Sequence, residues 1–145
     1  MLDVKQSVTI ARPPEVVYAL ITDVEATPRW SSAITRTVRH GEGPMEVGAT
    51  FTEEATLLGR VIRTVKVVTA LEEGTRYAEA AREGLLPHAV EMTLRPSGAG
   101  TTLTFHMSGD PGRGARVFGP FLGRVLRKQI ARDLKEMKRL LESGP

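Results

Sequence analysis

A long helical stripe of apolar residues near the C-terminus constrains the fold more than any other feature. Apolar residues spaced three or four apart lie on one face of an α-helix. The stripe consists of Leu122, Leu126, Ile130, Leu134, Met137 and Leu141, widened toward its N-terminal end by Phe118, Phe121 and Val125. This pattern predicts a helix of roughly 25 to 30 residues, ~40 Å long. In a chain of 145 residues, such a helix can bury its apolar face only by lying across another layer.

The middle of the chain, from residue 34 to residue 109, has the two-residue period of β-strands. The predicted strands span residues 34–39, 50–57, 61–70, 76–82, 88–95 and 101–108. Turns rich in glycine and proline separate them, among them residues 41–44 and 96–100. Because these connections are short, we expect neighbouring strands to be antiparallel.

The first part of the chain adds a strand and one or two short helices. Val4, Val8 and Ile10 alternate with polar residues, which predicts a strand ending at Ala11. The segment 13–15, Pro-Pro-Glu, suits a helix start. The order is therefore strand, one or two short helices, six strands and one long helix. Helices on one face of an antiparallel sheet define an α+β architecture, and we expect one domain spanning residues 1–145.

Composition excludes several classes of function. The chain has no cysteine, so disulfides and thiol catalysis are excluded. Its three histidines, His40, His88 and His106, fall on different predicted elements, so we expect no metal site. No dinucleotide or phosphate-binding motif is complete, and we expect no cofactor. The sequence also lacks a secretory signal pattern and an apolar run of ~20 residues. We therefore expect a cytoplasmic protein with no membrane insertion.

The predicted C-terminal helix is markedly basic. Between Arg113 and Glu142, nine lysines and arginines stand against three acids, whereas the whole chain has a net charge of +3. A helix of this charge is compatible with a protein that binds a partner through the basic face of the helix. A solvated face of this composition is also ordinary in proteins that bind no polyanion, and the basic residues lack the interleaved aromatics of a single-strand binder. We expect no nucleic-acid partner.

Several short motifs, in their order and spacing, carry a resemblance to a known superfamily. They are residues 11–18 (ARPPEVVY), 23–24 (DV), 28–30 (PRW), 47–51 (VGATF) and 100–104 (GTTLT), followed by the amphipathic C-terminal helix. Together they resemble the START-like, polyketide cyclase/dehydrase (SRPBCC) superfamily over essentially the whole chain. The resemblance implies a helix-grip fold, in which a seven-stranded curved antiparallel sheet wraps round the long helix and encloses a deep cavity. Most members bind hydrophobic molecules, and a minority catalyse cyclisation or dehydration without a shared catalytic signature.

Strand periodicity predicts which side chains face this cavity. A register that pairs Leu94 with Leu103 also pairs Met92 with Phe105 and Val90 with Met107, which gives one coherent apolar face. In that register His88 points inward and His106 outward.

The same alternation predicts the facing of two further strands, residues 76–82 and residues 50–57. Tyr77, Glu79 and Ala81 point inward, and Glu53 lies on the inner face between Phe51 and Ala55. For Glu53 and Glu79, a bulge or strand end that turns them to solvent is an equal alternative.

The register across Gly59 is open to two alternatives. A two-residue turn puts Ile62, Thr64 and Val68 inside and sets Glu54 opposite Arg63 outside. A three-residue turn instead puts inside the residues Val61, Arg63, Val65 and Val67. Periodicity alone does not choose between them.

These patterns favour binding or carriage of a small hydrophobic molecule. The predicted ligand-binding wall comprises Trp30, Phe51, Tyr77, Glu79, His88, Val90, Met92, Phe105, Met107, Phe118, Phe121 and Leu122. One alternative is an enzyme of the polyketide cyclase/dehydratase type. Its acid/base candidates are Glu53, Glu79, His88 and Tyr77. The other alternative is the interaction protein with a basic helix described above.

Overall fold

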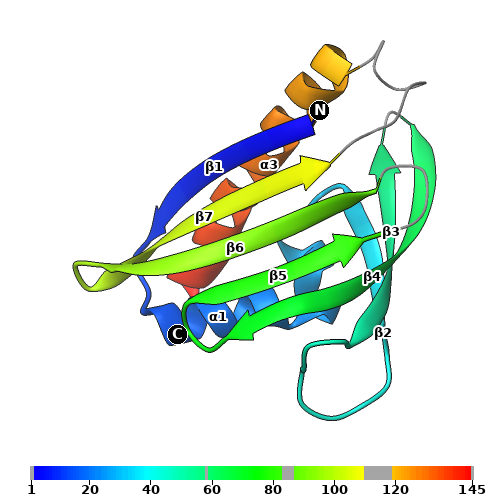
Figure 1. Cartoon of the computed structure of the whole chain (residues 1–145). Coiled ribbons are helices and arrows are strands. Elements are labelled where there is room, and N and C mark those ends of the chain that lie inside the picture. The colour runs from blue at the N-terminus through cyan, green and yellow to red at the C-terminus, as the bar shows by residue number, and fades with distance from the viewer. Residues whose placement is uncertain (1, 58, 83–86, 110–118, 145) are drawn as a thin grey trace.

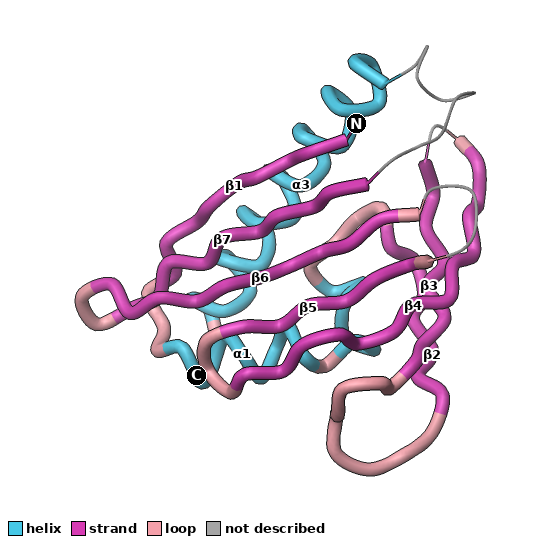
Figure 2. The backbone as a smooth tube through the Cα atoms, in the orientation of Figure 1, coloured by secondary structure: helices cyan, strands magenta, loops and turns pink. Residues whose placement is uncertain are grey.

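Seven antiparallel strands form one curved sheet in the order β1-β7-β6-β5-β4-β3-β2 (Figure 1). The computed structural model describes residues 2–57, 59–82, 87–109 and 119–144. The elements are β1 (Leu2–Ile10), α1 (Pro14–Thr22), η1 (Val24–Arg29), β2 (Ile34–His40), β3 (Thr50–Leu57), β4 (Arg60–Glu72), β5 (Arg76–Ala81), β6 (His88–Ser97), β7 (Gly100–Gly109) and α3 (Gly119–Ser143). The helices lie on one side of the sheet (Figure 2). This is the predicted helix-grip fold, which is confirmed.

The observed strands agree with the predicted ones to within two residues at each end. β1 ends at Ile10 rather than Ala11, because the backbone N–H of Ala11 donates to Glu142 Oε2 of α3, at 2.8 Å. The predicted start of the long helix, after Gly112, lies outside the described residues, and α3 is described from Gly119 onward.

The predicted register of the β6–β7 hairpin is confirmed. Leu94 pairs with Leu103, Met92 with Phe105 and Val90 with Met107. All six side chains are buried. His106 faces outward, where its ring contacts Asp3 at 2.5 Å.

The turn at Gly59 is the two-residue alternative, and the three-residue alternative is wrong. Leu57 pairs with Arg60, and Glu54 pairs with Arg63 across the β3–β4 hairpin. Gly59 has a φ of +77°, a left-handed conformation that glycine adopts at little cost. Val61 and Val65 consequently point to solvent, with 71% and 59% of their surface exposed.

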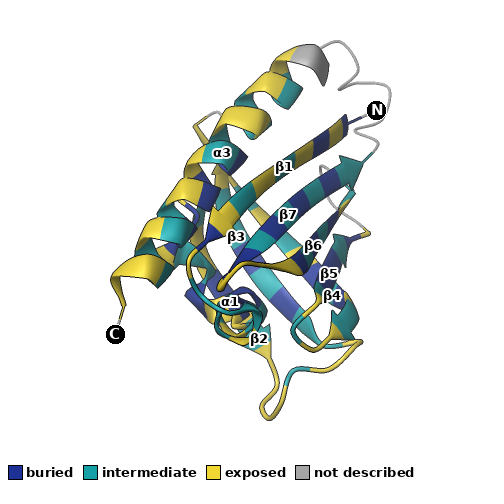
Figure 3. Ribbon diagram, turned by 90° about the vertical axis from the view of Figure 1, so that its left-hand side faces the viewer, coloured by how far each residue is buried: buried dark blue, intermediate teal, exposed yellow. Residues whose placement is uncertain are grey.

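Helix α3 packs chiefly along β1, at one edge of the sheet. On the side of α3 that faces the sheet, Ile130, Leu134 and Met137 are buried. The opposite side of the helix is exposed (Figure 3). Polar contacts add to this attachment: Gln6 Nε2 donates to the Arg127 carbonyl at 2.8 Å, and Lys138 Nζ donates to the Thr9 carbonyl at 2.6 Å. Because α3 contacts mainly the edge strand β1, it does not cover the whole concave face of the sheet by itself.

Within the described part of the chain, no helix is long and apolar enough to cross a membrane.

Two adjacent substitutions in α3 test the orientation of this helix. Leu134→Asp should lower the free energy of unfolding by about 3 kcal/mol or more, because it buries an unpaired charge. Lys135→Asp should change it by no more than ~0.5 kcal/mol, because Lys135 is exposed. Chemical denaturation of both variants measures the difference. Equal stabilities would mean that the buried face of the helix is assigned wrongly.

Candidate ligand-binding site

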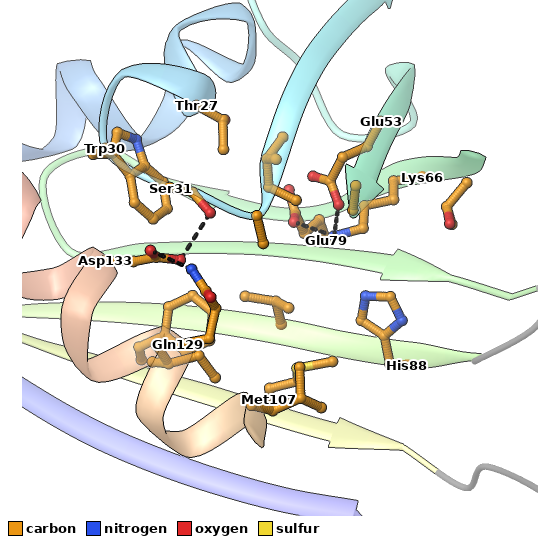
Figure 4. A pocket seen from close by; sticks show the side chains of 18 of the residues that line it. Thr27, Trp30, Ser31, Glu53, Lys66, Glu79, His88, Met107, Gln129 and Asp133 are labelled. Atoms are coloured by element: carbon orange, nitrogen blue, oxygen red, sulfur yellow. Dashed lines mark hydrogen bonds and ion pairs between the residues drawn. The ribbon is translucent and has the colours of Figure 1, made fainter. Parts of the chain in front are cut away.

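A cavity of about 250 Å³ lies between the concave face of the sheet and α3. Most of its wall is apolar. The apolar side chains include Val90 and Met92 from β6, Phe105 and Met107 from β7, and Leu126, Ile130 and Leu134 from α3. The buried carboxylates of the wall lie in two groups, which Figure 4 shows on separate parts of it.

The first polar group is a buried ion cluster formed by Glu53, Lys66 and Glu79 from the adjacent strands β3, β4 and β5. Glu53 pairs with Thr64, and Glu79 pairs with Val68, so Lys66 lies diagonally between the two acids. Long side chains reach such diagonal neighbours on a sheet face. Lys66 Nζ lies 3.1 Å from Glu53 Oε1 and 2.9 Å from Glu79 Oε1. All three residues are buried, with 4–8% of their surface exposed.

The two glutamates of this cluster differ in their hydrogen bonding. Glu79 is bonded at both oxygens, because the Tyr77 hydroxyl donates to Oε2 at 2.6 Å while Lys66 donates to Oε1. Glu53 contacts Lys66 through Oε1, at 3.1 Å. No donor among the described residues reaches its Oε2. Glu53 therefore has an unused acceptor in the cavity wall.

Burial and neighbouring charge set the proton affinities of the cluster. Burial raises the pKa of Glu53, and the charge of Glu79 raises it further, against the opposing effect of Lys66. Burial alone lowers the pKa of Lys66, but the charges of Glu79 and Glu53 outweigh it and the net shift is upward. Burial also raises the pKa of Tyr77, as does the charge of Glu79. Lys66 and Tyr77 thus keep their protons at neutral pH, whereas Glu53 binds a proton more tightly than an ordinary glutamate does.

The second polar group surrounds Asp133 of α3, which is 7% exposed. Its carboxylate accepts hydrogen bonds from Ser31 Oγ at 2.8 Å, Gln129 Nε2 at 2.9 Å and the Ser32 backbone N–H at 3.2 Å. Burial raises the pKa of Asp133, and these hydrogen bonds oppose the shift. Both carboxylate oxygens are engaged, so this group ties α3 to the segment after η1.

Most of the predicted wall residues surround the cavity. Those that line it are Trp30, Glu79, His88, Val90, Met92, Phe105 and Met107. Phe51 and Tyr77 face inward as predicted but belong to the packed core, with 1% and 0% exposure, and do not line the cavity. The physical reason is that α1 and η1 pack on that side of the sheet.

The other predicted wall residues lie on or before the first turn of the described α3. Phe121 is 57% exposed, Leu122 is half-buried, and neither lines the cavity. Phe118 lies outside the described residues. Of the acid/base candidates, Glu53, Glu79 and His88 line the cavity, and Tyr77 reaches it only through Glu79.

Sequence reasoning missed Lys66 and Asp133. Lys66 has the same strand parity as Thr64 and Val68, so the two-residue turn at Gly59 already implied an inward lysine. Asp133 follows Ile130 by three residues and precedes Met137 by four, which puts it within the apolar stripe. In both cases, a charged residue stands at a position where the periodicity of the strand or helix predicts an inward-facing side chain.

The fold and the cavity together define a helix-grip protein with a ligand-sized internal space. The sequence profile of the family described as "Polyketide cyclase / dehydrase and lipid transport" matches residues 1–142, and the chain belongs to this family. The predicted membership of the START-like superfamily is thereby confirmed. No curated protein matches the sequence.

Solved structures with the same fold include three informative cases. A START superfamily protein from Mycobacterium smegmatis has 17% identity and a TM-score of 0.80, over 97% of each chain. The Zhui aromatase/cyclase from Streptomyces sp. R1128 has 15% identity and a TM-score of 0.77, over 97% of this chain and 93% of that chain. The di-domain ARO/CYC StfQ from the steffimycin biosynthetic pathway has 19% identity and a TM-score of 0.79, over 97% of this chain and 51% of that chain. These similarities establish the fold.

Replacing Lys66 tests the buried ion cluster. Lys66→Met leaves two buried carboxylates without their cation, and should lower the free energy of unfolding by about 3–5 kcal/mol near neutral pH. The loss should shrink as the pH falls toward about 5, because protonation removes the buried charge. Denaturation curves at several pH values measure both effects.

The matched control is Arg63→Met on the same strand. Arg63 pairs with Glu54 at 2.8 Å on the outer face, where its side chain is 71% exposed. An exposed ion pair contributes little, so the control should lose at most about 1 kcal/mol. If both variants lost the same stability, Lys66 would not be buried in the ion cluster.

Proposed function

We propose that this protein binds or carries a small, largely apolar molecule in the cavity between the sheet and α3. The observation that supports the proposal best is the cavity itself, an apolar space of about 250 Å³. One water molecule needs only about 10–15 Å³ of such cavity space, so the cavity is much larger than a single water site. A ligand that displaces weakly bound water from apolar walls binds with a favourable free-energy change.

The composition of the wall supports a small and adaptable ligand. Ligand sites are mostly apolar, with a few polar groups that orient the molecule, and the ion cluster and His88 are such groups here. Met92 and Met107 on adjacent strands line the cavity. Methionine side chains adapt to irregular shapes, which favours a flexible or aliphatic molecule over a large flat ring system.

An enzyme of the cyclase/dehydratase type is the second candidate. Glu53 supports it, because its raised pKa and unused oxygen suit a general acid or base that faces the cavity. The family description and the named aromatase/cyclases of the same fold also include such enzymes. Lys66 is unsuited to act as a base or an amine nucleophile, because the two glutamates keep it charged.

The basic outer face of α3 gives less support to an interaction protein. Arg139 pairs with Glu136, and Lys138 pairs with Glu142 at 2.7 Å. These contacts neutralise part of the charge within the helix itself, so we make no separate proposal for this surface.

Filling the cavity tests the binding function. Octanol should bind the wild-type protein in calorimetric titrations, and Thr64→Phe should weaken its binding by about tenfold or more because the ring occupies the cavity. Val65→Phe is the matched control, because the adjacent Val65 points to solvent; it should leave binding unchanged. Native mass spectrometry of protein purified from its own host would show the natural ligand as added mass. Absence of octanol binding, or equal weakening by both variants, would contradict the proposal.

The enzyme candidate has its own test. If Glu53 transfers a proton, Glu53→Gln should slow conversion of the molecule recovered with the protein by roughly 100-fold and leave its affinity nearly unchanged. Glu54→Gln provides the control, since Glu54 lies on the outer face and pairs with Arg63. A molecule that is bound and released without chemical change by the wild-type protein would leave carriage as the function.

A further inference from the structure

The wall of the cavity carries more buried carboxylates than cations. Its described residues include the carboxylates of Glu53, Glu79 and Asp133, which are 8%, 8% and 7% exposed. They include one lysine, Lys66, and no arginine, with His88 as the other basic side chain. Buried charges are costly unless they are paired, so this imbalance bears on which ligands the cavity accepts.

Lys66 cannot form an ion pair with an anionic ligand without weakening its contacts with Glu53 and Glu79. Its ammonium lies within 3.1 Å of Glu53 and 2.9 Å of Glu79, and only 4% of the residue is exposed. A ligand carboxylate placed beside it would lie next to two negative charges of the protein. Such an arrangement leaves buried negative charge unpaired, which is unfavourable.

Glu53 is the carboxylate that remains available to a ligand. Asp133 and Glu79 accept hydrogen bonds at both of their oxygens. Glu53 lies 3.1 Å from Lys66 through Oε1, and no described residue donates a hydrogen bond to Oε2. Its side chain is 90% buried and lies in the cavity wall (Figure 4). A donor group on a ligand would complete the hydrogen bonding of this carboxylate.

We infer that the cavity selects an apolar molecule bearing a protonated amine, which sits against Glu53, and discriminates against apolar carboxylic acids. This inference rests on the proposed binding function and specifies its ligand class. An ammonium supplies both the missing donor and the missing positive charge. Hydrogen bonds between charged groups are about twice as strong as neutral ones, so an amine gains more at this position than an alcohol of equal length.

The groups that face Glu53 determine how binding depends on pH. Lys66 and Glu79 lie beside it on β4 and β5, Tyr77 is bonded to Glu79, and His88 and Asp133 reach the cavity from β6 and α3. Burial raises the pKa of Glu53, and the charge of Glu79 raises it further, so a proton competes with a ligand ammonium for this carboxylate. An ammonium replaces that proton. Affinity for an amine should therefore increase as the pH rises through the raised pKa of Glu53, and binding below that pKa should release a proton.

Three probes of equal chain length test the inference: octylamine, octanol and octanoate. An alkylammonium, like that of lysine, keeps its proton up to a pH of about 10. In calorimetric titrations at about pH 7.5, octylamine should bind about tenfold or more tighter than octanol, and octanoate should bind most weakly. As the pH is raised through the elevated pKa of Glu53, the octylamine affinity should rise and the octanol affinity should stay constant. Titrations in buffers of different ionisation enthalpy report the released proton.

Glu53→Gln should reduce octylamine affinity to that of octanol, whereas the outward-facing control Glu54→Gln should retain the preference. The pH series and the proton release use only the wild-type protein, so they test the inference even if Glu53→Gln fails to fold. Octanoate binding as tightly as octylamine, or an amine preference that persists in Glu53→Gln, overturns the inference. If octanol binds and octylamine has no advantage, the inference fails and the binding function stands. If none of the three probes binds, both fail.

Discussion

The buried contact of Lys66 with Glu53 and Glu79 is the interaction on which the rest of the site depends. A lysine with 4% exposure is tolerated only because two carboxylates lie within 3.1 Å of its ammonium. That arrangement requires β3, β4 and β5 to keep their register, since a slip of one residue would bury Val65 and Val67 and expose Lys66. The bulge at Thr69, between Val68 and Ala70, places Val68 opposite Glu79 and still turns Leu71 inward opposite Tyr77. We therefore regard the cluster as a determinant of register as well as of ligand chemistry.

The cavity exists because the two layers diverge. Helix α3 packs closely along β1 at the sheet edge, and α1 and η1 cover another part of the concave face. The sheet is curved (Figure 1), and the side chains of the cavity wall leave a space of about 250 Å³ between it and α3. Protein interiors are otherwise close-packed, so an unfilled space of this size has to be maintained by rigid walls. The seven-stranded hydrogen-bonded sheet and the buried stripe of α3 supply that rigidity.

Fold and function are specified by different residues in this protein. Structures that share only 15–19% of their residues with this chain superpose on nearly all of it, which is expected when alternation and helical periodicity determine the backbone. Function lies in the few side chains that interrupt the apolar wall. Here these are an ion cluster with one more carboxylate than cation and a separate aspartate that is bonded at both oxygens. They make the interior electronegative, although the chain as a whole is basic.

The sequence by itself determined the order of the elements, the register of β6 with β7, and the inward direction of His88. These features follow from alternation and helical spacing, which are local properties of the chain. For Glu53 and Glu79, alternation left an inward and a solvent-facing position as equal alternatives, and the structure shows both residues buried in the cavity wall. Tertiary structure decided the rest. The turn at Gly59 has two sterically acceptable lengths, and the choice between them, which buries Lys66, depends on partners on three strands. The bulge at Thr69 and the separation of Phe51 and Tyr77 from the cavity depend on how far the sheet curves from each helix. That curvature is the sum of many long-range contacts, and no single segment of the sequence encodes it.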